Sequence, residues 1–194
     1  MGKNRLEAFS DGVVAILITI MVLGLAAPAT GDLAALRALL PHFLGYALSF
    51  LLLGIYWNNH HHLIQAVQAV DGRVLWANLH LLFWLSLVPF ATGWITSTGF
   101  APLPVATYGL VFLLAAVAYF LLARALVALH GPGSVLAEAM GRDWKGRGSL
   151  LIYLLAVPLA FVSAATSMAL NVLVALVWLI PDRRIETRVR DRGT

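Results

Sequence analysis

The chain has 194 residues, of which 61% are hydrophobic and only 11% are charged, and its formal net charge is +4. This balance is too apolar and too poor in charge for an ordinary soluble domain. Because the sequence contains no cysteine, disulfides, thiolate metal sites and cysteine nucleophiles are excluded. No RNA or DNA motif accompanies the basic residues, so we expect no nucleic-acid partner.

Long stretches without Asp, Glu, Lys or Arg cover most of the sequence: 12–31, 38–70, 74–123 and 148–181. One helical membrane crossing needs about 20 such residues, so four stretches hold more than four crossings. The two longest must fold back on themselves. We expect their turns at 99–104, which contains two prolines, and at 163–167, the least apolar part of the last stretch.

The sequence therefore predicts an all-α membrane protein with six transmembrane helices in one domain, residues 1–194. A basic cytoplasmic tail, 182–194, follows the last crossing. The expected helices are 5–26, 39–64, 74–98, 104–129, 147–163 and 166–181.

The basic residues predict the orientation of these helices, because Lys and Arg near helix ends are retained on the cytoplasmic side. With both termini in the cytoplasm, Arg37 is the one basic residue that lies outside. The other twelve of the 13 Lys and Arg residues then lie inside. A five-helix count would place the five C-terminal arginines outside and break this rule.

The first predicted helix carries an aliphatic stripe with one hydroxyl. At about 100° per residue, four side chains share one face, which Arg5, Phe9 and Gly12 continue toward the cytoplasm; the four are Ile16, Thr19, Ile20 and Leu23. Copies of this face around an axis would line a narrow pore. The same pattern also suits a helix that faces lipid or the protein core, so the stripe alone leaves both interpretations open.

Asp11 lies about 140° around the helix from Ile16, and we expect it to point into the subunit's own bundle. A carboxylate at membrane depth costs about 2.5 to 3.5 kcal/mol and requires a partner. We expect a polar network at the cytoplasmic end, in which one or two histidines act together with Trp57 and Asn78. This network would bind Ser10 and Asp11 and hold the first helix in place.

Three consecutive histidines, His60, His61 and His62, raise the question of a metal site. Neighbouring residues on a helix point about 100° apart, so three adjacent imidazoles cannot converge on one ion. We therefore expect no metal and no cofactor.

The motif Arg5-x3-Phe9-Ser10-Asp11-Gly12-x3-Ile16-x2-Thr19 resembles the first-helix signature of the transmembrane protein 175 family, the endolysosomal and bacterial potassium channels. Residues 56–63 and 78–92 are similar to that family's second and third helices. The resemblance implies a homotetramer that conducts K⁺ and other monovalent cations. It also implies a pore lined by the first helices. The short, single-unit chain, rich in Ala, Leu and Arg, indicates a bacterial plasma membrane.

Carried over by position, the resemblance makes Ile16 the main hydrophobic constriction, with Ile20 and Leu23 continuing it outward and Thr19 adding a ring of hydroxyls. Ala15 stands where some family members have a hydroxyl residue. This departure implies weak selectivity for potassium over sodium.

Two other classes of function would require different arrangements of residues. A secondary or proton-coupled transporter would use Asp11 and the histidines as ion sites near mid-membrane. An enzyme would need a nucleophile with its base or a convergent cluster of metal ligands. The sequence shows neither, so we expect no enzymatic activity.

Overall fold

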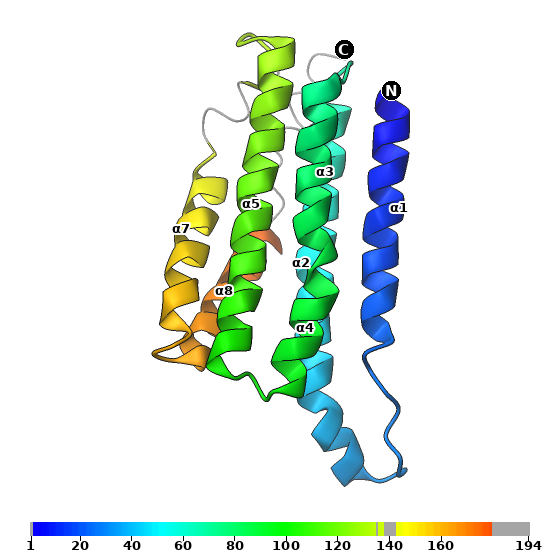
Figure 1. Ribbon diagram of the computed structural model, residues 1–194, viewed down its shortest axis with the longest axis vertical. Coiled ribbons are helices and arrows are strands. Elements are labelled where there is room, and N and C mark those ends of the chain that lie inside the picture. Colours follow the sequence, from blue (N-terminus) through cyan, green and yellow to red (C-terminus); the bar gives the residue numbers. More distant parts are fainter. Residues whose placement is uncertain (1, 135, 138–142, 180–194) are drawn as a thin grey trace.

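The computed structural model describes residues 2–134, 136–137 and 143–179. The predicted tail, 182–194, lies outside these residues. The described part is helical and contains no strand, and its helices lie side by side in one elongated bundle (Figure 1). They are α1 Lys3–Val22, α2 Leu33–Gln65, α3 Gly72–Ser86, α4 Val88–Ser97, α5 Pro102–His130, α7 Trp144–Leu159 and α8 Ala164–Leu179.

Three helical segments are long and apolar enough to cross a membrane: Leu33–Gln65, Gly72–Ser97 and Pro102–His130. The remaining helices are shorter or carry more charge. α1 has 20 residues with four charged ones in its first half, and α7 and α8 have 16 residues each.

Both predicted turns lie beside helix breaks, although most of the second one, 163–167, lies inside α8. α4 ends at Ser97 and α5 begins at Pro102, and between them Gly99 and Phe100 have positive φ angles of 60° and 61°. The second break separates α7, which ends at Leu159, from α8, which begins at Ala164.

The single helix predicted over 74–98 is instead two helices, α3 and α4. Pro89 has no backbone N–H to donate, and its ring disfavours an unbroken helix. The Leu87 N–H bonds to the Trp84 carbonyl at 3.2 Å, a tighter i−3 turn, and α4 starts at the next residue. The prediction of one regular helix was therefore wrong at this point.

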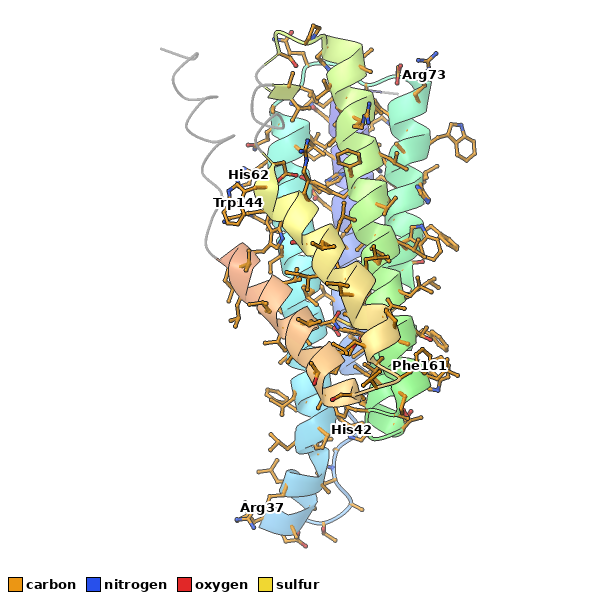
Figure 2. The ribbon with its side chains drawn as sticks, turned by 90° about the vertical axis from the view of Figure 1, so that its left-hand side faces the viewer. Arg37, His42, His62, Arg73, Trp144 and Phe161 are labelled. Atoms are coloured by element: carbon orange, nitrogen blue, oxygen red, sulfur yellow. The ribbon has the colours of Figure 1, made fainter. Side chains whose placement is uncertain are left out.

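α2 begins at Leu33, six residues before the predicted start at 39. The Asp32 carboxylate accepts a hydrogen bond from the Ala35 N–H at 2.7 Å and so caps the helix. This N-terminal end of α2, with Pro41 inside it, extends past the rest of the bundle, and Arg37 lies near its tip (Figure 2). α1 ends earlier than predicted, at Val22, and Gly24 and Pro28 follow it.

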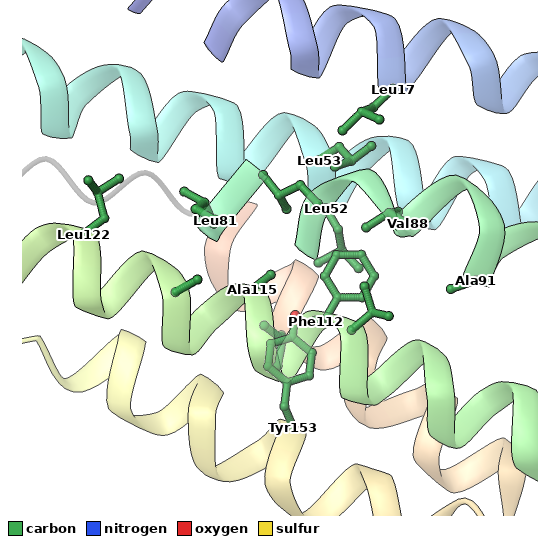
Figure 3. Packing of buried hydrophobic residues seen from close by; sticks show 14 of the residues in the cluster. Leu17, Leu52, Leu53, Leu81, Val88, Ala91, Phe112, Ala115, Leu122 and Tyr153 are labelled. Atoms are coloured by element: carbon green, nitrogen blue, oxygen red, sulfur yellow. The ribbon is translucent and has the colours of Figure 1, made fainter. Parts of the chain in front are cut away.

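The bundle's core lies around α5 (Figure 3). The Phe112 ring has its centroid 4.9 Å from that of Tyr108 and 6.1 Å from that of Tyr153 on α7. Hydroxyl groups tie α2, α4 and α5 together, because Ser49 Oγ lies 2.7 Å from Thr92 Oγ1 and 3.0 Å from the Tyr108 hydroxyl. α1 packs at one edge against α2, α3 and α4, and α7 lies at the opposite edge (Figure 1).

Candidate functional site

α1 has one buried face and one exposed face. The buried residues follow a spacing of three or four and contact the rest of the bundle: Leu6, Ser10, Val14, Leu17 and Met21. The predicted stripe lies on the other face, where Ile16 is 56% exposed and Leu23 is 80% exposed. Ile20, Thr19 and Phe9 are exposed with them. The structure therefore turns the whole predicted stripe away from the chain's own core.

The exposed face of α1 differs in composition from the exposed middle of α7. The middle of α7 exposes Leu151, Leu154 and Leu155. The α1 face instead mixes aliphatic side chains with Gly12, Ala15 and the Thr19 hydroxyl. A small, partly polar helix face is less typical of contact with lipid tails than an all-leucine one.

Thr19 donates its hydroxyl hydrogen to the Ile16 carbonyl at 2.9 Å. A hydroxyl oxygen has two lone pairs, and this backbone bond uses neither of them. The Thr19 oxygen therefore keeps its acceptor capacity on the exposed face, one turn from Ile16.

A buried chain of hydrogen bonds joins α1, α2 and α3. His60 Nε2 lies 2.7 Å from Asn78 Oδ1, Asn78 Nδ2 donates to Ser10 Oγ at 2.9 Å, and Ser10 donates to the Leu6 carbonyl at 2.9 Å. Since an amide oxygen only accepts, His60 must carry its proton on Nε2. All three side chains are at most 4% exposed. This relay fixes α1 against the other two helices.

A second, more exposed set of contacts lies beside the relay. Trp57 Nε1 donates to Asp11 Oδ1 at 2.9 Å, and His61 Nδ1 lies 3.1 Å from Glu7 Oε1. The partner of Asp11 is therefore the indole and not a histidine. The Trp57 and His61 rings stack with centroids 5.9 Å apart. These contacts tie two successive turns of α1 to α2.

The structure thus brings together most of the expected network residues: Ser10, Asp11, Trp57, His60, His61 and Asn78. Arg5 and Phe9 are exposed and take no part in these bonds. Two members of the network were not predicted from the sequence, Glu7 and Gln65. Glu7 contacts His61, and the Gln65 amide nitrogen lies 2.8 Å from His61 Nε2. Their spacing could have predicted this, because Glu7 lies one helical turn before Asp11 and Gln65 lies one turn after His61, on the same helix face in each case.

The histidine run does not form a metal site in the described residues. His60 faces Asn78, and His61 faces Glu7. Within residues 2–134, 136–137 and 143–179, no group of three or more His, Asp or Glu side chains could hold a metal ion.

Comparison with known proteins places this chain among membrane channels. The model of the family described as endosomal/lysosomal potassium channel TMEM175 matches residues 5–89. A protein of Chryseobacterium named as a potassium channel is 50% identical to this chain, over 98% of this chain and 100% of that protein. One of Streptomyces collinus, also named as a potassium channel, is 33% identical over 96% of each chain.

The fold is similar to a solved structure as well. The crystal structure of a lysosomal potassium-selective channel TMEM175 homolog from Chamaesiphon minutus superposes with a TM-score of 0.80. The identity is 28%, and the match covers 92% of this chain and 96% of that one. By its family model, its full-length relatives and its fold, this chain belongs to the TMEM175 family, a family of channels and not of enzymes.

Proposed function

We propose that this chain is one subunit of a homotetrameric, potassium-permeable channel, and that α1 lines its central pore. The observation that carries the proposal is the division of α1 into two faces. One is anchored to α2 and α3 by the buried relay, and the other holds the exposed stripe with its hydroxyl. The relatives named as potassium channels support the same function.

One chain supplies one α1, and a closed pore requires several copies around an axis. The resemblance to TMEM175 suggests four. Native mass spectrometry of the purified complex tests this number, and any other stoichiometry would contradict it.

Ile16 forms the narrowest part of the proposed pore, and Ile20 and Leu23 continue it outward. A narrow ring of aliphatic side chains excludes water, so an ion cannot pass it without losing hydration that nothing replaces. A small widening of the ring restores water and conduction. The ring of Ile16 side chains is thus a hydrophobic gate.

Thr19 supplies the polar ring next to this gate. Its free oxygen lone pairs can replace part of the water around a cation. One flexible hydroxyl per subunit discriminates between ions less sharply than a cage of backbone carbonyls. With Ala15 in place of a second hydroxyl, the pore conducts potassium with weak selectivity over sodium. Monovalent cations are therefore permeant ions and not cofactors.

We place six crossings in a bacterial plasma membrane, with both termini in the cytoplasm. The crossings are α1, α2, the α3–α4 pair, α5, α7 and α8. Lys3, Arg5, Arg73, Arg124 and Arg147 then lie near cytoplasmic helix ends, and Arg37 lies outside. The 16 residues of α7 span about 24 Å, a modest mismatch that a bilayer accommodates.

A transporter would place its ion-binding groups near mid-membrane. In this chain Asp11 and Glu7 of α1 instead bind Trp57 and His61 of α2, in the half of α1 that bears its N-terminus. This arrangement favours a structural role for them and leaves conduction to the exposed stripe.

The absence of cysteine allows the orientation to be tested with single-cysteine variants. We expect Gly31→Cys, in the α1–α2 connection, to react with a membrane-impermeant maleimide on intact cells. Gly133→Cys, after α5, should react only after the membrane is permeabilised. The reverse pattern would contradict the orientation.

Ile16→Asn should increase potassium flux into liposomes at least tenfold, because a ring of amides holds water in the constriction. Leu151→Asn is the matched control, since Leu151 is 57% exposed and belongs to α7, which lies at the opposite edge of the bundle from α1. Its flux should equal that of the wild type. Sodium flux measured in parallel should fall within the same order of magnitude as potassium flux. Unchanged flux in the folded, tetrameric Ile16 variant would reject the gate.

Asn78→Leu should destabilise the protein by about 1 to 3 kcal/mol, because it leaves the buried His60 N–H without an acceptor. Thermal unfolding in detergent measures the change. Asn58→Leu is the control, since Asn58 is exposed and has no side-chain hydrogen bond within the described part of the chain. Equal unfolding temperatures for the two variants would show that the relay does not hold α1.

A further inference from the structure

A cavity of about 280 Å³ lies behind the C-terminal half of α1, between α1, α2 and α4. Ile20 and Met21 of α1 line one side together with Gly24, which follows that helix. Pro89, Phe90 and Gly93 of α4 line another side. This position is separate from the exposed stripe, although Ile20 contributes to both. A cavity of about 150 Å³ lined by apolar side chains binds benzene. The space here is therefore large enough for one substituted aromatic ring.

Polar groups interrupt the apolar lining on one side. His42 and Tyr46 come from α2, and Thr92 and Thr96 come from α4. Both threonines donate their hydroxyl hydrogens to carbonyls of α4, the Val88 carbonyl for Thr92 and the Thr92 carbonyl for Thr96. The hydrogens of both threonine hydroxyls are therefore already used in these bonds. The polar groups of the lining that can still bind a ligand through a hydrogen atom or a lone pair include His42 and Tyr46 of α2.

His42 has no hydrogen-bond partner within the described residues. Its Nδ1 atom is buried and unpaired. Nε2 is likewise without a protein partner but is not among the buried atoms, so it is the ring nitrogen left open to a ligand. Because Nδ1 is buried, Nε2 is the nitrogen that a ligand can bind without a movement of the imidazole ring. His42 lies on α2 where that helix leaves the bundle (Figure 2).

We propose that this cavity is a binding site for a small neutral amphiphile, with a compact apolar or aromatic body and one hydroxyl group. The apolar body fills the space between Ile20, Phe90 and Gly93, and the hydroxyl binds His42 Nε2. A hydroxyl both donates and accepts, so it satisfies either tautomer of the imidazole. Simple alkylphenols have this chemistry, and a membrane-soluble molecule reaches the site from the bilayer.

Occupancy of the site reduces conduction, a consequence that rests on the proposed pore. To widen the ring of α1 helices, each α1 must move outward, toward α2 and α4. The cavity provides the space for that movement at Ile20 and Met21. A ligand in this space opposes the movement and keeps the constriction narrow.

Photolabelling of the intact protein in liposomes with a diazirine-bearing alkylphenol tests the site directly. We expect saturable labelling of peptides that contain 20–25 and 90–96. An excess of 4-isopropylphenol should compete, whereas isopropylbenzene, which lacks only the hydroxyl, should compete about three- to tenfold less well. His42→Phe should remove this preference for the phenol.

Gly93→Val fills the cavity, since a Cβ at Gly93 meets no atom within 4 Å, and it should abolish the labelling. Gly54→Val, on α2 outside the cavity lining, is the control with equally open space and should label normally. Saturable labelling absent from the folded oligomer, or unaffected by Gly93→Val, would overturn the site.

Potassium flux in the same liposomes should fall at least twofold at saturating 4-isopropylphenol, and Gly93→Val should remove this inhibition. Unchanged flux in a conducting, labelled protein would overturn the coupling to α1. If the protein conducts no ion at all, the proposed channel fails, while the labelling still decides whether the cavity binds the phenol.

Discussion

The rotation of α1 about its own axis decides what this protein presents to the space outside its bundle. The buried relay from His60 through Asn78 to Ser10 sets that rotation, because its three side chains come from three helices and leave little geometric freedom. Turning α1 by half a turn would bury the stripe and leave the buried Asn78 amide N–H without its acceptor on Ser10. In a membrane such a loss has no compensation from water. A polar contact therefore determines which apolar face is free.

The anchoring of α1 is uneven along its length. Every side-chain hydrogen bond from α1 to another helix in the described structure comes from its first half, at Lys3, Glu7, Ser10 and Asp11. The second half, from Gly12 to Val22, is held by apolar packing through Val14, Leu17 and Met21. The cavity lies beside this second half. The helix is thus fixed at one end and has room to move at the other, where the constriction is proposed.

Much of the fold follows from the sequence because a membrane imposes strong length and charge constraints. The uncharged stretches predicted a helical bundle, and the prolines and glycines around 99–104 predicted a turn, both of which the structure confirms. The family resemblance rested on residues 5–92 and is confirmed by the comparisons. The break at Leu87 was missed because proline is tolerated in many membrane helices. The early start of α2 was missed because Arg37 interrupts the uncharged stretch.

The candidate site was predicted less completely than the fold. Helical spacing places Asp11 away from the stripe, but spacing within one helix cannot say which residue on another helix meets it. In the structure Asp11 binds Trp57. His60 instead binds Asn78, and His61 contacts Glu7. Such pairings depend on how α1 and α2 are shifted along each other. That shift is a property of tertiary packing, which hydropathy and periodicity do not encode.

The central claim, that the exposed face of α1 lines a pore, is tested most directly by a cysteine scan along this helix in the naturally cysteine-free chain. A positively charged thiol reagent should block potassium current when cysteine replaces Gly12, Ile16, Thr19, Ile20 or Leu23. It should have no effect at the buried positions Val14, Leu17 and Met21. Block at the buried positions as well, or no block anywhere along α1 in a conducting protein, would contradict the account.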